Sequence, residues 1–186
     1  MKTFPSLAKV PASVALSADD ILEFHAARVL LLLRVAGVAG RIDGLTKLAK
    51  LDFFVRYPQF FEQVSQHIRQ PMSAAVRTVE SSMIRFHYGP WDKRYYHVLA
   101  YLEAKSLIRI LDHKGTHRFQ LTSEGKVVAN QVLRRPSFGP LSMQMKAVKK
   151  LLGNRSGSSL KRLIYEVFDA EVASRPIGAP IQDDKT

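Results

Sequence analysis

The sequence DKRYYHVLAYLEAKSLIRILDHKGTHRFQLT, residues 92 to 122, predicts a helix followed by a two-stranded β-hairpin. Asp92 belongs to the residue types that cap helix N-termini. Apolar side chains then recur at the i, i+3, i+4 and i+7 positions of one helix face: Tyr95, Val98, Leu99 and Leu102. LIRILD and HRFQLT alternate like strands on either side of a turn at Gly115. Thr122 begins the next helical pattern.

Helical patterns also precede this segment. Ser17 resembles a helix N-cap, and apolar side chains follow it at helical spacing up to about Val35. Glycines then turn the chain, and LTKLAKLDFFVRY predicts a second helix that ends before Pro58. QFFEQVSQHIRQ predicts a third, short helix. MIRFHY predicts a short strand that Gly89-Pro90 ends.

The order of these elements predicts the fold class. Three helices, a two-stranded wing and a further helix, SEGKVVANQVLRR, follow one another. We therefore expect a mainly α protein with a small β-wing: a winged helix-turn-helix domain over residues 17–135, after an N-terminal tail of residues 1–16. Within it, residues 92–106 take the position of the recognition helix. A basic helical extension over residues 136–172 follows, and the apolar-poor segment 173–186 predicts a disordered tail.

Composition narrows the class of protein. The 186 residues include no cysteine, which excludes disulfides and thiolate metal sites, and we expect a soluble cytoplasmic protein without a membrane partner. The 28 Lys and Arg residues exceed the 16 Asp and Glu residues, which gives a formal net charge of +12 and a pI near 10.1. This excess favours a polyanionic partner or an acidic protein surface. Much of it lies between Glu124 and Glu166, where nine cations and no acid occur.

No pattern in the sequence supports catalysis. His87, Asp92 and His97 lie close together, but no serine, threonine or cysteine is placed to act with them as a nucleophile. His113 and His117 have a spacing that zinc sites use, yet they flank the predicted hairpin turn and no cysteine pair accompanies them. GNRSGSS lacks the lysine that follows the last glycine of a phosphate-binding loop. We therefore expect no enzymatic activity, no cofactor and no bound metal.

Nucleic-acid binding is better supported. The DNA-binding candidates are the cations that open the recognition helix, lie on the wing or line the C-terminal helix: Lys93, Arg94, Lys114, Arg118, Lys146, Lys149 and Lys150. Contact with the DNA backbone is the expected mode, because RYYHVLAYLEAK offers tyrosines and aliphatic residues rather than the Arg, Asn and Gln that read base edges. Tyr96 and Tyr101 lie off the apolar seam and are better suited to a protein interface.

Two segments together resemble a known family. GLTKLAKLDFFVRYP at residues 44–58 and MIRFHYGPWDKRYYHVLAYLEAKSLI at residues 83–108 resemble the middle components of ABC-three-component defence systems. These are small winged-helix subunits found beside an SMC-like ATPase and an effector, as in Lamassu-type anti-phage and anti-plasmid systems. The resemblance covers roughly residues 20–135. It implies a non-catalytic adaptor that docks on the ATPase heads and helps to couple DNA engagement to activation of an effector such as a nuclease.

The resemblance also suggests partner-binding positions. Motif residues that match are Lys47, Lys50, Tyr88, Trp91, Arg94 and Tyr95. With the two tyrosines placed off the seam, the partner-binding candidates become Lys47, Lys50, Tyr88, Trp91, Tyr96 and Tyr101. Trp91 has an alternative role, since a lone tryptophan can instead cover the core beneath the Gly89-Pro90 turn. The alternative function is a stand-alone winged-helix DNA-binding transcriptional regulator, which would normally dimerise to match two half-sites.

Overall fold

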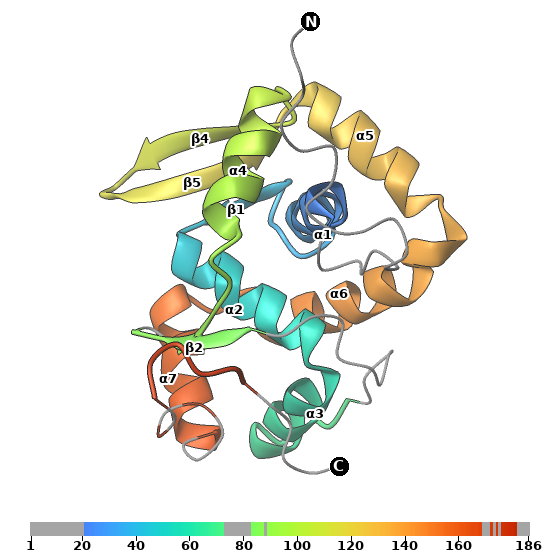
Figure 1. The fold of residues 1–186 in the computed structure, drawn as a ribbon. Coiled ribbons are helices and arrows are strands. Elements are labelled where there is room, and N and C mark those ends of the chain that lie inside the picture. The colour runs from blue at the N-terminus through green and yellow to red at the C-terminus, as the bar shows by residue number, and fades with distance from the viewer. Residues whose placement is uncertain are drawn as a thin grey trace, which may run out of the picture.

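The computed structural model describes residues 21–72, 83–87, 89–168, 172, 174 and 176–181. The described chain is mainly helical, with a small three-stranded and a small two-stranded antiparallel sheet (Figure 1). The helices are α1 (Leu22–Val35), α2 (Leu45–Arg56), α3 (Pro58–His67), α4 (Tyr95–Ala104), α5 (Ser123–Leu133), α6 (Gly139–Leu152) and α7 (Gly157–Val167), with a short 3-10 helix at Pro136–Phe138. The strands are β1 (Arg41–Asp43), β2 (Ile84–Phe86), β3 (Gly89–Trp91), β4 (Ile108–His113) and β5 (Thr116–Leu121).

The predicted hairpin is confirmed, and a third strand joins it. β4 and β5 are antiparallel, and Lys114 and Gly115 form the turn with φ values of 52° and 73°. Both values lie in the left-handed region that a two-residue hairpin turn requires. β1 pairs antiparallel with β5 and completes a sheet of order β1-β5-β4. The sequence did not predict β1, because three residues after a glycine-rich turn are too few to show alternation.

The predicted helices are also confirmed within the described residues. The seam of α4 is buried, and each of its four apolar residues is at most 4% exposed. Thr122 caps α5, where its side-chain oxygen accepts a hydrogen bond from the backbone N–H of Gly125 at 2.9 Å. Gly125 itself packs against the backbone of Leu107, where a Cβ would lie 1.8 Å from the carbonyl oxygen. The predicted N-cap at Ser17 lies outside the described residues.

Helix α1 lies at the centre of the upper part of the molecule. Figure 1 shows α4 on one side of it and α5 and α6 on the other, with β1 nearby. Because neighbours cover α1 on several sides, the run from Val29 to Leu33 is at most 2% exposed, and Arg28 is buried with it at 1%. The apolar run that the sequence places between two arginines is therefore a core helix.

The helices after Pro136 belong to the same core. Helices α6 and α7 both pack against α2, and Met145, Val148, Leu160 and Ile164 are fully buried in the main hydrophobic cluster. The approach of α7 to α2 is close, because a Cβ on Gly157 would lie 2.9 Å from the backbone nitrogen of Lys47. The predicted extension over residues 136–172 is thus not an appendage: its helical character is confirmed, but it supplies one wall of the core.

The end of the chain also differs from the prediction. Residues 176–181 lie along β2, with hydrogen bonds from the N–H of Arg85 to the carbonyl of Ala179 and from the N–H of Ile181 to the carbonyl of Met83. Ile181 is 1% exposed. Disorder of the whole segment 173–186 is therefore wrong for these six residues. The prediction of disorder rested on the low apolar content of the segment. Composition does not reveal that a buried isoleucine and hydrogen bonds to a strand edge hold these residues in place.

Tyr57 links this C-terminal segment to the core. Its hydroxyl accepts a hydrogen bond from the N–H of Met83 at 2.7 Å and donates one to the carbonyl of Ile181 at 3.1 Å. We predict that Tyr57→Phe lowers the free energy of unfolding by about 1–3 kcal/mol, because both backbone groups lose a buried partner. Urea denaturation measures this change. Tyr96→Phe is the control, since that side chain is 60% exposed; equal stability of the two variants would contradict the prediction.

Candidate nucleic-acid and partner interface

A buried cluster of charges fixes the start of α4. Asp92 precedes the helix, and its carboxylate accepts hydrogen bonds from Arg56 at 2.7 Å and from Arg94 at 2.7 and 2.8 Å. Asp52 in α2 accepts one from Arg28 in α1 at 3.2 Å and one from the Tyr95 hydroxyl at 2.7 Å. Two carboxylates thus connect α1, α2 and α4 through three arginines.

The cluster shifts the pKa values of its members. Burial alone would raise the pKa of Asp92, but the hydrogen bonds from Arg94 and the charge of Arg56 outweigh it and hold this pKa well below its usual range. Burial likewise disfavours the charge of Arg56, yet the nearby Asp52 and Asp92 raise its pKa above the usual value. The buried phenol of Tyr95 has a raised pKa, because burial and the charge of Asp52 both oppose its ionisation.

Arg94 belongs to this cluster, which corrects its predicted role in DNA binding. Its guanidinium bonds to Asp92 and lies 2.8 Å from Nε2 of His25, and its side chain is only 32% exposed. His25 also lies 3.0 Å from Arg28 through Nδ1 and is buried. The sequence places Arg94 at the open end of a helix, but the preceding aspartate turns the guanidinium toward the protein interior. Arg94 therefore fixes the position of α4.

The two predicted partner-binding lysines of α2 are also engaged within the fold. Lys50 is fully buried, and its amino group donates to the carbonyl of Pro90 in β3 at 2.8 Å. Lys47 is half-buried and donates to the carbonyl of Gly153 at the end of α6 at 2.8 Å. A polar stripe on α2 predicts a solvent-facing side, but β3, α6 and α7 cover it. The prediction that Lys50 contacts a partner is therefore wrong, because its side chain is buried within the fold.

Trp91 is a core residue as well. It is 6% exposed, stacks on Phe86 at 5.9 Å between ring centroids, and meets Tyr95 edge to face at 5.5 Å. This is the alternative role, in which the tryptophan covers the core. Gly89 and Pro90, which the sequence predicted to end a strand, instead belong to strand β3 and pair with β2. The predicted exposed anchor at this position is wrong, because β3 turns the indole inward against the start of α4. Tyr88, another partner-binding candidate, lies outside the described residues.

The outer face of α4 remains available to a partner. Tyr96 is 60% exposed, and Tyr101 is half-buried beneath the amino group of Lys105, 5.7 Å from its ring centroid. Other outward side chains of α4 include His97 and Glu103. The face thus combines the aromatic ring of Tyr96 with the polar side chains of His97 and Glu103. Among the described residues of α4, no arginine, asparagine or glutamine points outward.

The wing presents fewer unpaired cations than the sequence suggests. Lys93 before α4 and Lys114 at the hairpin turn are exposed. Arg118 instead pairs with Asp43 across β1 and β5, with Nε 2.6 Å from one carboxylate oxygen and Nη2 3.2 Å from the other. Its hydrogen bond lowers the pKa of Asp43 and raises that of Arg118. The charge of Arg118 is therefore largely compensated within the sheet.

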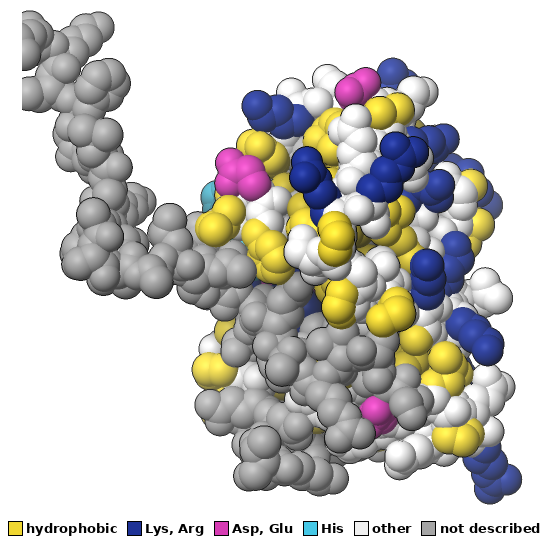
Figure 2. Space-filling model, turned by 90° about the vertical axis from the view of Figure 1, so that its right-hand side faces the viewer, with side chains coloured by type: hydrophobic (Ala, Val, Ile, Leu, Met, Phe, Trp, Pro, Cys, Tyr) yellow, Lys and Arg dark blue, Asp and Glu magenta, His cyan; other side chains and the backbone are white. Residues whose placement is uncertain are grey.

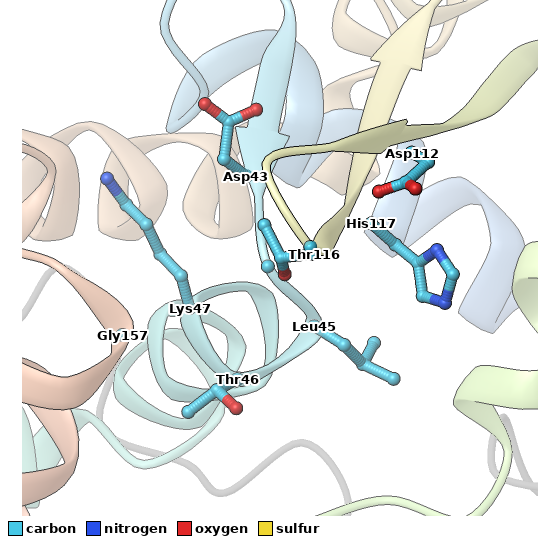
Figure 3. Close-up of a pocket in the computed structure, with 10 residues that line it drawn as sticks. Asp43, Leu45, Thr46, Lys47, Asp112, Thr116, His117 and Gly157 are labelled. Atoms are coloured by element: carbon cyan, nitrogen blue, oxygen red, sulfur yellow. The ribbon is translucent and has the colours of Figure 1, made fainter.

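One hollow lies between the wing and the N-termini of α2 and α7. Its volume is about 590 Å³, and Figure 3 shows Asp43 and Lys47 on one side of it and Asp112 and His117 on the other. Thr46 and Thr116 also line it, but among the described residues no hydrogen bond joins either hydroxyl to His117. The hollow has mixed charge and no activated nucleophile in the part of the chain that the structure describes.

Cations gather on a different side of the molecule, over α5 and α6. Figure 2 shows Lys and Arg side chains along one half of that side, where acidic side chains are few. We define the basic face as five exposed side chains from three helices: Arg34, Lys126, Lys146, Lys149 and Lys150. Lys149 also donates to the carbonyl of Gly37 at 3.1 Å. The sequence predicted the three α6 lysines and placed Lys126 in the same acid-free stretch; it missed Arg34, which lies in α1.

The ion cluster was missed for a related reason, although a signal was present. Arg28 and Asp52 occupy positions on the apolar faces of predicted helices, flanked by residues that are buried. A charged residue at such a position is almost never fully buried unless it is paired. That rule indicates a partner for each of them, but the sequence alone gives no means of matching Arg28 to a residue 24 positions away.

No protein-family model, curated protein or solved structure matches this chain. None of the described helices combines the length and the apolar character that crossing a bilayer requires. In the described part of the chain, His, Asp and Glu side chains form no group of three or more that could hold a metal ion.

Lys50 makes stability depend on pH. Burial, together with the charge of Lys161, lowers the pKa of Lys50 to about 7, whereas in the unfolded chain it should be about 10.4. Between these two pKa values the unfolded chain binds more protons than the folded chain, so the free energy of unfolding rises with pH across this window. Below the window, the folded protein bears the full cost of burying the charged amine. We predict that this rise amounts to roughly 2 kcal/mol between about pH 7 and about pH 9.

Lys50→Met removes the titrating group and keeps the length of the side chain. We therefore expect urea denaturation to show that the free energy of unfolding of the wild type, relative to that of the variant, increases by this amount between the two pH values. Lys105→Met, at an exposed position, should follow the wild type. Parallel stability profiles for the wild type and Lys50→Met would contradict the prediction.

Proposed function

We propose that this protein is a non-catalytic adaptor subunit with a winged helix-turn-helix core, which contacts the DNA backbone through its basic face and a protein partner through α4. The observation that carries the proposal is the basic face itself. Its five cations come from α1, α5 and α6, and no acid occurs between Gly125 and Tyr165 to balance those of α5 and α6. Such a surface attracts a nucleic acid whatever the base sequence of that nucleic acid.

The order of elements supports a winged helix-turn-helix core. Helix α1, strand β1, helix α2, helix α4 and the hairpin β4–β5 follow one another, and the sheet order is β1-β5-β4. In this interpretation α4 is the recognition helix and the hairpin is the wing. Helix α3 and the β2–β3 hairpin are then an insertion between the second and third helices, and α6 and α7 complete the core.

The outward side chains of α4 favour a protein contact over base reading. A helix that reads the major groove presents donors and acceptors such as Arg, Asn and Gln. Here the helix presents Tyr96 and His97, while Arg94 is held by Asp92. Tyrosine is enriched at the energetic centres of protein interfaces. These observations support an adaptor over a stand-alone transcriptional regulator.

The family resemblance suggests the class of the partner. The resemblance of residues 44–58 and 83–108 to middle components of ABC-three-component systems points to the heads of an SMC-like ATPase, with an effector such as a nuclease as the third component. We place this contact on the exposed face of α4 around Tyr96. The adaptor would then report DNA engagement at one surface to a partner at another.

We predict that the wild type binds a labelled DNA duplex with a strong salt dependence, and that replacing Lys146 and Lys150 together by glutamine weakens it. Each lost phosphate contact should make the slope of log affinity against log salt shallower by about 0.9. Fluorescence anisotropy over a salt series measures the slope. Lys114→Gln tests the wing with one charge removed. Absence of duplex binding by the wild type at low salt would contradict the DNA part of the proposal.

We predict that Tyr96→Ala reduces capture of an SMC-like ATPase encoded beside this gene, by about 2 kcal/mol if Tyr96 is an interface anchor. The melting temperature should stay close to that of the wild type, because the side chain is 60% exposed. Met143→Ala is the matched control, since Met143 is 53% exposed on α6. Pull-down and thermal melting on the same samples measure both effects. Undiminished capture by Tyr96→Ala would exclude this face.

A further inference from the structure

Two hollows adjoin each other within and beside the basic face. The first has a volume of about 350 Å³ and is lined by Arg34, Lys126 and Lys149 together with the backbone turn at residues 37–40. The second has a volume of about 280 Å³ and lies between β4, β5 and the start of α5, where Arg109 and Ser123 line it. Lys126 lines both hollows.

The cations of the first hollow are held by neutral groups. Nε of Arg34 donates to the side-chain oxygen of Asn130 in α5 at 3.0 Å, and Lys149 donates to the carbonyl of Gly37. The first bond orients the guanidinium and leaves its two terminal nitrogens without a further partner among the described residues. Lys126 passes beside Gly40, where a Cβ would lie 3.7 Å from its Cε. A left-handed glycine, with φ at 77°, therefore shapes the wall beside this lysine.

Among the described residues, no acidic side chain lines either hollow. Elsewhere in the described chain, several arginines are neutralised by a carboxylate, as Arg56 is by Asp92 and Arg118 by Asp43. The three cations of the first hollow have no such partner in the part that the structure describes. Mutual repulsion of like charges that line one hollow costs free energy, and a bound anion would offset it. The hollow therefore has the charge and the donors of an anion site.

We propose that the hollow lined by Arg34, Lys126 and Lys149 binds one phosphate group of a nucleic-acid backbone. This inference rests on the proposed function and assigns its central contact. The terminal nitrogens of Arg34 supply a planar pair of donors that matches two phosphate oxygens, and the two lysines supply point charges. The next phosphate along the strand would then lie toward Arg109 in the second hollow.

A nucleic-acid strand fits this arrangement better than an acidic peptide. Each strand of a duplex carries one charge per about 3.4 Å of helix axis, whatever the base sequence. Two adjoining hollows with a shared lysine present cations in a row, from Lys149 and Arg34 through Lys126 to Arg109. A free phosphate ion would use the first hollow only, so the second hollow distinguishes the two sources of the same ligand chemistry.

The test compares single-charge variants on a labelled DNA duplex by fluorescence anisotropy over a salt series. Arg34→Gln, Lys126→Gln and Lys149→Gln should each weaken binding several-fold at low salt and make the salt slope shallower by up to about 0.9. Arg109→Gln should weaken it too, through the second hollow. Arg69→Gln, an exposed position at the end of α3, removes the same charge and should leave the slope unchanged. Thermal melting confirms that each variant is folded.

Two further probes separate the alternatives. Inorganic phosphate, added at constant ionic strength, should shift the Arg34 Nε–H resonance in a nitrogen-15 NMR spectrum, and more strongly than chloride does. Polyglutamate that binds as tightly as the duplex, with the same dependence on Arg34 and Lys126, would overturn the assignment in favour of an acidic protein. Tight binding of inorganic phosphate without duplex binding would overturn it in favour of a free anion, and would also contradict the proposed function.

The remaining outcome isolates this inference. If the wild type binds the duplex and Lys146 and Lys150 matter, but the three variants of the hollow keep the wild-type slope, then the proposed function stands and the phosphate site is wrong.

Discussion

The carboxylate of Asp92 joins three parts of the molecule, and the surfaces that α4 presents depend on it. It receives Arg56 from α2 and Arg94 from the start of α4, and Arg28 of α1 approaches to 3.9 Å. Burying such charges costs several kcal/mol per ion, so the cluster is weak support for stability as such. Its geometry is demanding, however, because an arginine left without its carboxylate would be a buried, unpaired charge. We infer that the cluster fixes the orientation of α4, and with it the outward position of Tyr96.

This cluster changes how the charge of the chain is understood. A net charge of +12 suggests a uniformly basic surface, but Arg28, Arg56 and Lys50 are buried and bonded within the core. Burial lowers the pKa of Lys50 to about 7, so even its charge is weakened near neutral pH. Exposed cations lie over the side of α5 and α6, with few acidic side chains among them (Figure 2). Burial thus separates charges that hold the fold from charges that can meet a ligand.

The sequence predicted the helices and the β4–β5 hairpin because these depend on local spacing. The seam of α4 and the cap at Thr122 each involve residues within a few positions of one another. Contacts between distant positions have no such signal: Arg34 meets Asn130 across 96 residues, and Tyr57 meets Ile181 across 124. Predictions of surface roles were wrong where they considered only the segment that carries the residue. The indole N–H of Trp91 would suit an interface, yet the neighbouring Phe86 and Tyr95 pack against the ring in the core.

The two surfaces that remain lie on different sides of α1, and this arrangement suits an adaptor. Figure 1 shows α4 on one side of α1 and α5 and α6 on the other, so a ligand on the basic face would leave Tyr96 accessible. Helix α1 contacts all three helices and carries both Arg28 of the ion cluster and Arg34 of the basic face. A largely buried helix of 14 residues therefore connects the surface that we assign to DNA with the surface that we assign to a protein. Such a connection allows simultaneous occupation of both surfaces, whereas a regulator that reads DNA through α4 would use that face for the DNA itself.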